Sequence, residues 1–190
     1  ISDGYQNTPQ NSFIEKNGMA VVYANHFSIK DSINNLKWEE IKGFGHSKSV
    51  MQSLPLTEKP ILNHEKAPVL SYEFFTETIA NKAMLNLVAI PTHPVSTDSE
   101  LRVAVQWNEE PIQLINFKTT GRSNTWKQNV LSNTAIKQIE IPINKQGKQE
   151  LKIYMVDPGV LLDYFVLNTR NQHQTPYKLM SETKLNTLKQ

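Results

Sequence analysis

Leu151-Lys-Ile-Tyr-Met-Val-Asp-Pro-Gly-Val-Leu-Leu-Asp-Tyr-Phe-Val-Leu167 joins two apolar segments of different pattern. From Leu151 to Val156, apolar side chains alternate with others, which is the period of a half-buried β-strand. Asp157-Pro-Gly159 predicts a tight turn, because proline presets its φ and glycine accepts a positive φ. From Val160 to Leu167 the chain is apolar almost throughout, which predicts a strand buried on both of its faces.

Short apolar segments and turn residues alternate in the same way along the rest of the chain. One helix is a candidate, at residues 123–133 with Ser123 or Asn124 as its cap, although an extended conformation fits this segment nearly as well. About nine closely spaced strands and at most one short helix predict an all-β fold, an antiparallel β-sandwich. The further strands are predicted at residues 18–24, 36–42, 47–56, 69–75, 82–90, 101–107, 112–117 and 136–143.

The domain organisation follows from where this pattern starts and stops. The sequence of 190 residues suffices for one domain with a sizeable core. Residues 1–18 are polar and are expected to form a linker or an N-terminal arm, residues 19–168 the β-sandwich, and residues 169–190 a polar C-terminal tail. Because the chain begins with Ile1-Ser2 and shows no signal-peptide pattern, we expect a processed product or a piece of a longer protein.

Composition excludes several classes of protein. Apolar residues make up 38% of the chain and charged residues 20%, which is typical of a folded globular protein and not of a disordered one. No apolar run is long enough to span a bilayer, so no membrane partner is expected. The net charge of +2 is too small to predict a nucleic-acid partner. The chain has no cysteine, which excludes disulfides, thiolate metal sites and a cysteine nucleophile.

A series of motifs occurs in the order of a known family. In this order they resemble the C-terminal domain of glycoside hydrolase family 115, the xylan α-glucuronidases. The resemblance runs from about Met19 to about Leu167, and its most specific parts are the last two motifs. The motifs are Ala24-Asn-His-Phe27, Trp38-Glu-Glu-Ile-Lys-Gly-Phe-Gly-His-Ser47, Ala67-Pro-Val-Leu-Ser-Tyr-Glu-Phe74, Ile90-Pro-Thr-His-Pro94, Leu101-Arg-Val-Ala-Val105, Trp126-Lys-Gln-Asn-Val-Leu-Ser-Asn133 and Leu151-Lys-Ile-Tyr-Met-Val-Asp-Pro-Gly-Val160.

The resemblance implies a jelly-roll sandwich, similar to galactose-binding domains, that serves as a non-catalytic accessory domain. Catalysis would lie in another domain of the parent glycoside hydrolase, which would act on plant polysaccharide, with glucuronoxylan as the expected substrate. The implied partners are that polysaccharide or its oligosaccharides and the catalytic domain of the same chain, and the implied location is secreted or periplasmic. The alternative is a purely structural domain, which packs on the catalytic domain or mediates a homodimer and has no glycan site.

The chain is more distantly similar to carbohydrate-binding module families 6 and 35, which bears on metal binding. Tyr72-Glu-Phe74 and Leu162-Asp163 match motifs of those modules, whereas Tyr23-Ala-Asn25 replaces their early Glu-Ala-Glu. In those modules the two glutamates and the late aspartate hold a structural calcium. Here Asp163 and the Asn25 amide are the candidate metal ligands, and they are a poor set for a cation that takes six to eight oxygens. We therefore expect that no cofactor is required, with a structural calcium as the alternative.

Aromatic and polar residues near predicted turns are the candidates for sugar binding. Trp107 ends a strand beside the turn that begins at Asn108, so its ring faces either solvent or the core. Trp126 lies in a polar segment and either stacks on a sugar or anchors that segment to the sandwich. His46 follows a glycine turn and is either a rim residue or an ordinary loop histidine. Trp38 lies inside a strand pattern and is predicted to be a core residue.

Two aspartates flank the predicted turn. Asp157 is expected to accept N–H hydrogen bonds within its own turn. Asp163 interrupts an apolar strand and needs partners, so we expect it to bond to a neighbouring loop, directly or through a cation. A glycosidase also uses two carboxylates, but both aspartates lie in one segment and no other residues suggest a site around them. The chain alone is therefore not expected to be catalytic.

Overall fold

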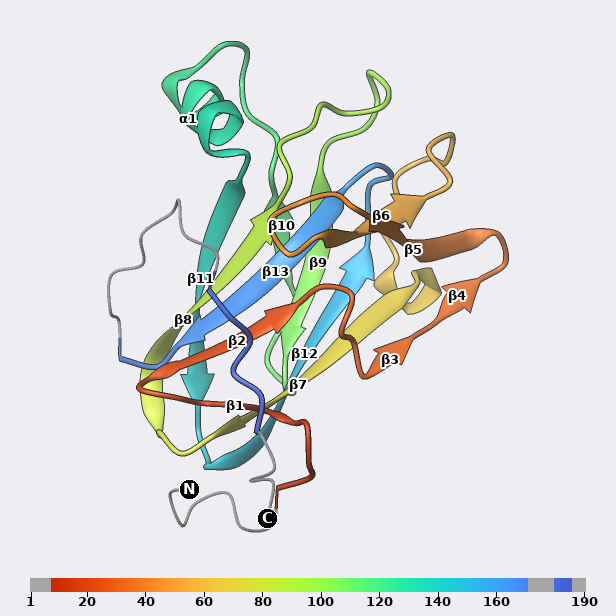
Figure 1. Ribbon diagram of the computed structural model, residues 1–190. Helices are drawn as coiled ribbons and strands as arrows, with labels where there is room; N and C mark the ends of the chain where they lie inside the picture. Colours follow the sequence, from red (N-terminus) through yellow and green to blue (C-terminus); the bar gives the residue numbers. More distant parts are fainter. Residues whose placement is uncertain (1–7, 171–179, 186–190) are drawn as a thin grey trace.

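The chain folds into two β-sheets that face each other, as the computed structural model of residues 8–170 and 180–185 shows (Figure 1). In the first sheet the strands lie in the order β1, β7, β12, β9, β10, and β3 pairs with β7 along the same edge as β1. All of its pairs are antiparallel except β1 with β7. Its strands are β1 (Phe13–Ile14), β3 (Ile29–Lys30), β7 (Val69–Thr76), β9 (Arg102–Trp107), β10 (Gln113–Asn116) and β12 (Gly147–Met155).

The second sheet is antiparallel throughout. Its order is β11, β8, β13, β6, β5, β4, and β2 also pairs with β13. Between the strands lie the 3-10 helix η2 (His64–Lys66) and the α-helix α1 (Asn124–Ser132). The strands of this sheet are β2 (Met19–Tyr23), β4 (Ser32–Ile33), β5 (Leu36–Lys42), β6 (Ser49–Leu54), β8 (Ala80–Ala89), β11 (Ala135–Ile143) and β13 (Leu161–Asn168).

The predicted β-sandwich is therefore confirmed, and so is its one short helix. The turn at Asp157–Gly159 does not form a hairpin, because β12 lies in the first sheet and β13 in the second. It carries the chain from one layer to the other. The predicted strands at residues 101–107 and 112–117 form a hairpin around Asn108, since β9 and β10 pair directly. Within residues 8–170 and 180–185, neither helix is long and apolar enough to cross a membrane.

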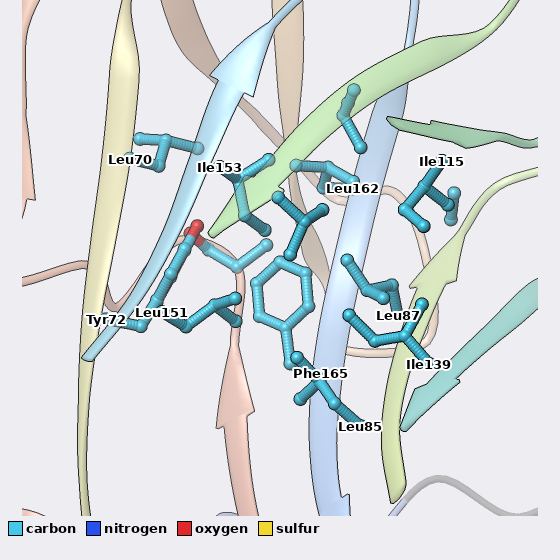
Figure 2. Close-up of a cluster of buried hydrophobic side chains, with 14 of the residues drawn as sticks. Leu70, Tyr72, Leu85, Leu87, Ile115, Ile139, Leu151, Ile153, Leu162 and Phe165 are labelled. Carbon is cyan, nitrogen blue, oxygen red and sulfur yellow. The ribbon is translucent and has the colours of Figure 1, made fainter. Parts of the chain in front are cut away.

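The core fills the space between the two sheets (Figure 2). Alternate residues of β12, such as Leu151 and Ile153, point inward, as the period of two in the sequence predicts. Phe165 of β13 meets them from the other sheet and lies 4.8 Å, centroid to centroid, from the ring of Tyr72. The Tyr72 hydroxyl donates to the carbonyl of Ala24 at 2.7 Å, so its polar atom is satisfied inside the apolar core.

All eight residues of β13 are buried, as the sequence predicts for this strand. Its second face is covered by a smaller apolar cluster that includes Tyr164 and Val166. Met180 packs on this cluster from the C-terminal segment. Two layers of apolar contact explain why β13 lacks the alternation that β12 shows.

The two ends of the described chain are integrated into the sandwich, which differs from the expected arm and tail. Glu15, in the expected arm, is buried and bonds to the backbone N–H groups of Glu77 and Thr78. Residues 180–185, in the expected tail, run beside β1 and β2, where Thr183 exchanges hydrogen bonds with Ile14 and Val21. Polar composition suggested loose ends, but these side chains and backbone groups find partners on the exposed strand edges.

Candidate functional site

A pocket lies beside α1 at one end of the sandwich. Its volume is about 480 Å³, within the range of small-molecule sites, and it is open to solvent. The loop between β8 and β9 contributes one wall, and the segment between β10 and α1 contributes the other. Figure 1 shows α1 and the β8–β9 loop at the same end of the molecule. The lining residues are His93, Thr119, Gly121, Arg122 and Trp126.

Local helix chemistry fixes Trp126 in this pocket. Ser123 adopts an extended conformation as N-cap, and its Oγ accepts the backbone N–H of Trp126 at 3.2 Å. Asn133 ends the helix in the left-handed conformation, with φ of 52°. The Trp126 side chain is half-buried, so part of its ring stays accessible to a ligand. The capped helix, expected as one of two conformations, is the one that forms.

Arg122 precedes the N-cap and is exposed at the pocket wall. It forms no ion pair within residues 8–170 and 180–185. The carboxylate of Glu100, in the β8–β9 loop, is already bound by Lys118 at 2.6 Å and by the Asn116 amide at 2.9 Å. Those hydrogen bonds lower the pKa of Glu100 below its ordinary value. The guanidinium of Arg122 is therefore available to a ligand.

Trp107 and Asn108 lie at the other end of β9 from this pocket. The strand starts after the β8–β9 loop and, in Figure 1, runs away from α1 to end at Trp107. Trp107 is only 2% exposed, its ring contacts Phe74, and its indole N–H donates to the carbonyl of Pro142 at 2.9 Å. This ring belongs to the core and offers no free face to a sugar. Trp38, predicted as core, is buried as well.

The Asn108 side chain holds the β9–β10 turn to the neighbouring strand β12. Its amide donates to Gln149 Oε1 at 2.9 Å, and its Oδ1 accepts the backbone N–H of Glu150 at 2.8 Å. Asn108 itself has a positive φ of 49°, a conformation that asparagine tolerates in turns. Both polar groups of the side chain thus have structural partners.

Asp163 closes the loop between β5 and β6 by direct hydrogen bonds. It is fully buried, at a bulge where the pairing of β13 with β8 shifts between Leu162 and Tyr164. Its Oδ2 accepts the His46 backbone N–H at 2.8 Å, and its Oδ1 accepts the Ser47 N–H at 3.0 Å and the Ser47 hydroxyl at 2.5 Å. Burial and then the Asp163 charge raise the pKa of Tyr164 to about 12. The expected bonding of Asp163 to a neighbouring loop is present.

His46 therefore lies in the loop that Asp163 holds and does not line the pocket that contains Trp126. Its ring Nδ1 lies 3.3 Å from Asp163 Oδ2, so the ring packs against the carboxylate that its own backbone binds. Gly45, just before it, has a φ of +76°, and an added Cβ would lie 2.8 Å from Asp163 Oδ1. The loop approaches the carboxylate this closely only because that position is glycine.

The candidate metal ligands do not fit a calcium ion in this arrangement. Both Asp163 oxygens already accept N–H or O–H groups from the loop. The Asn25 amide nitrogen donates to Glu40 at 3.2 Å, and its Oδ1 is buried without a partner. One free amide oxygen is far from the six to eight oxygens that calcium takes. Within the described part of the chain, no cluster of three or more His, Asp or Glu side chains could hold a metal.

Asp157 makes a different contact from the one expected. Its carboxylate accepts the backbone N–H of Arg102 at 2.8 Å and two guanidinium N–H groups at 2.7 and 3.1 Å, not the N–H groups of its own turn. These hydrogen bonds raise the pKa of Arg102 above its ordinary value. The bidentate pair ties the turn between the sheets to the start of β9.

Of the predicted sugar-binding residues, only Trp126 lines the pocket, and Trp107, Asn108 and His46 do not. The sequence interpretation missed Arg122, Thr119 and His93. In the sequence, His93 belongs to the motif Ile90-Pro-Thr-His-Pro94, which indicates the family resemblance and no binding site. A signal was present, because binding residues commonly lie on loops held by a rigid scaffold, and all three residues lie between predicted strands.

Comparison with known families gives one match that covers most of the chain. The family model described as the glycosyl hydrolase family 115 C-terminal domain matches residues 12–177. Comparison with curated proteins gave no match.

Solved structures with similar folds include three carbohydrate-related proteins. One is described as BtGH115A, a family GH115 4-O-methyl-alpha-glucuronidase with specificity for decorated arabinogalactans. It matches with a TM-score of 0.64 and 25% identity, and the match covers 83% of this chain and 18% of that chain. The family 35 carbohydrate-binding module from Clostridium thermocellum has TM-score 0.50 and 10% identity, covering 78% and 97% of the two chains. The Podospora anserina GH26-CBM35 β-(1,4)-mannanase has TM-score 0.50 and 10% identity, covering 84% and 29%. The chain thus spans about a fifth of the length of the family 115 enzyme it matches.

Proposed function

Since the chain belongs to the family of glycosyl hydrolase family 115 C-terminal domains, we propose that it is a non-catalytic accessory domain that binds plant polysaccharide for its parent enzyme. Glucuronoxylan is the proposed substrate. The observation that carries this proposal is the open pocket in which the half-buried Trp126 ring lies among polar side chains. An enzyme that acts on such polymers would be secreted or periplasmic.

The pocket has the chemistry that sugar binding needs. An indole face packs on the apolar face of a pyranose ring, and donors around it bond to the hydroxyl groups. Here Thr119, His93 and Arg122 supply polar groups around Trp126. Most of the lining comes from loops on a rigid sandwich, which is where proteins commonly place binding residues.

The two aspartates of the β12–β13 segment support a non-catalytic role. A glycosidase places two carboxylates on either side of the scissile bond, where substrate reaches both. Asp157 and Asp163 are both fully buried, and each is bound by groups of its own protein. Neither carboxylate can therefore reach a polysaccharide without unfolding part of the sandwich.

Isothermal titration calorimetry of the 190-residue chain tests the proposal. The ligands are glucuronoxylan oligosaccharides, with and without calcium, and arabinogalactan oligosaccharides as a second class. Saturable binding that Trp126→Ala abolishes would support the proposal. Leu131→Ala is the matched control, because Leu131 lies on the same helix, is 77% exposed and does not line the pocket. Flat titrations with every ligand would overturn a glycan-binding role for these classes.

A structural role is the second candidate, and the outer face of α1 favours it. Val130 and Leu131 are 50% and 77% exposed, so the helix presents an apolar face that nothing in the described chain covers. Such a face suits packing on the catalytic domain of the same enzyme or on a second copy of the chain. Amide hydrogen exchange of α1 distinguishes the two occupants. Protection seen only in the full-length enzyme supports docking on the catalytic domain. Protection of the isolated chain that rises with its concentration supports a dimer.

A further inference from the structure

The C-terminal segment, residues 180–185, lies in a groove between β1 and β2, one strand from each sheet. Figure 1 shows this segment in dark blue, passing β2 and reaching β1. β7 binds one edge of β1 and β13 binds one edge of β2, so the other edge of each strand faces the groove. We propose that this groove is a binding site for an extended peptide of a protein partner, and that residues 180–185 occupy it in this structure. The inference is independent of the glycan site beside α1.

The first argument is that three backbone N–H groups of the groove walls have their acceptors in the segment. The N–H of Ile14 donates to the carbonyl of Thr183 at 2.8 Å, and the N–H of Val21 donates to Thr183 Oγ1 at 2.9 Å. The N–H of Tyr23 donates to Glu182 Oε1 at 2.9 Å. A buried N–H group that loses its acceptor costs free energy comparable to a lost hydrogen bond. The groove therefore favours an extended occupant that brings acceptors to both walls, as in recognition by strand addition.

The second argument is that two side chains of the segment give the site specificity. The Glu182 carboxylate accepts the Tyr23 N–H and lies 2.8 Å from Nδ1 of His26, with its side chain only 11% exposed. Met180 packs on the buried apolar cluster that includes Val21. Side chains two positions apart in an extended chain point to the same side, so both anchors reach the β2 wall. The fitting partner is a peptide with an apolar residue two positions before a carboxylate, followed by a hydroxyl residue.

The third argument is that the segment can leave the groove without unfolding the sandwich. None of its six residues is buried, whereas all eight residues of β13 are. Its pairing with β1 is a single bridge, between Phe13 and Lys184, and not a ladder. Elements with few buried apolar groups open at a lower free energy than core strands do. The groove can therefore exchange this occupant for another of the same chemistry.

The test measures binding of a fluorescent peptide with the sequence of residues 180–185 to the 190-residue chain, by fluorescence anisotropy. Glu182→Ala/Thr183→Ala in the chain removes the side-chain acceptors of its own segment and frees the groove. We expect the peptide to bind this double variant about tenfold more tightly than the wild-type chain, because a tethered segment competes at an effective concentration of about 1 mM. Near-ultraviolet circular dichroism, which reports the buried Trp38 and Trp107 rings, checks that the sandwich is intact.

A double-mutant cycle tests whether the peptide lies in the groove as the segment does. In the double variant, His26→Gln should weaken binding about threefold, and Glu182→Gln in the peptide should do the same. Both changes together should weaken it no more than either alone, because they remove the same contact. Ser181→Ala in the peptide is the control, since Ser181 is exposed, and it should leave binding unchanged.

Hydrogen exchange of the wild-type chain tests the opening of the groove without any variant. The amides of Thr183 and Leu185, bonded to Val21 and Ser12, should exchange at least about tenfold faster than those of β13. Exchange as slow as that of β13 would show a permanent strand and would overturn the inference. A lack of peptide binding to an intact double variant would overturn it as well, as would effects of His26→Gln and the peptide change that simply add.

Discussion

The loop held by Asp163 and the pocket beside α1 both carry polar side chains, and they differ in what those side chains contact. In the loop, the Asp163 carboxylate is surrounded by N–H and O–H groups of His46 and Ser47. In the pocket, Arg122 has no carboxylate partner among the described residues, and Trp126 keeps part of its ring exposed. A polar group inside a strand is bound by its own protein because burial requires it, whereas a polar group on a rim can remain available to a ligand.

The two tryptophans provide the sharpest form of this comparison. Trp107→Ala should lower the free energy of unfolding by about 4 kcal/mol, because it opens a cavity in the core and removes the bond to Pro142. Trp126→Ala should lower it by only about 1 kcal/mol, since that ring is half-buried. Urea denaturation of the two variants measures both values. Similar losses would contradict the assignment of Trp107 to structure and Trp126 to a binding surface.

Asp163→Asn tests whether the loop is held as described. The amide can accept only on one atom, so at least one loop N–H loses its partner, and we expect a loss of about 3 kcal/mol. Amide exchange at His46 and Ser47 should accelerate more than exchange in β12, because the loop is released first. Asp98→Asn is the control, since Asp98 is exposed. A loss no larger than that of the control would show that the hydrogen bonds to Asp163 contribute little.

Glu15 extends the comparison to a second internal carboxylate. Burial alone would raise its pKa, but hydrogen bonds from Thr169, Thr78 and the backbone N–H of Glu77 outweigh burial and lower it below the ordinary value of 4.5. A carboxyl whose pKa is lowered by folding stabilises the fold above its unfolded pKa, and this stabilisation is lost as the pH falls through the folded pKa.

The stability difference between the wild-type chain and Glu15→Gln should therefore be largest near neutral pH and should shrink below pH 4.5. Urea midpoints across this pH range measure the difference. Glu109→Gln, at an exposed position, is the control variant for removing one carboxylate from the chain. A difference in stability between wild type and Glu15→Gln that grows toward acidic pH would contradict a lowered pKa of Glu15 in the folded chain.

Much of the fold follows from patterns that are local in the sequence. The alternation at residues 151–156 and the apolar run at 160–167 correspond to β12 and β13. A strand buried on one face alternates apolar and polar residues, whereas a strand buried on both faces is apolar throughout. Strands of two residues, such as β3 and β4, were not predicted, since two residues carry no period. The docking of residues 180–185 was also missed, because it depends on a free strand edge that only the folded sheets create.

The site was harder to predict for the same reason. Trp107 and Trp126 both stand beside polar turns in the sequence, and only the fold places Trp107 in the core at the end of β9 and Trp126 at a pocket on α1. Arg122 became a candidate only when the structure showed which carboxylates were already bound, since pairing between distant residues has no local signature. The sequence did predict that Asp163 needs partners, because a carboxylate within an apolar strand is costly to bury without hydrogen bonds.

The smallest expected effect concerns calcium, and it tests whether the loop held by Asp163 can admit an ion. A ligand that binds only the folded state at about 1,000 times its dissociation constant stabilises it by about 4 kcal/mol, which a thermal melt detects readily. Because the Asp163 oxygens are bound by His46 and Ser47, we expect the melting temperature of the chain to be the same in calcium and in a chelator. A rise in calcium that Asp163→Asn abolishes would show that the loop opens to admit the ion. That result would mean that the hydrogen bonds to Asp163 do not keep the β5–β6 loop closed against calcium. The free Asn25 oxygen would then be the first additional ligand to test.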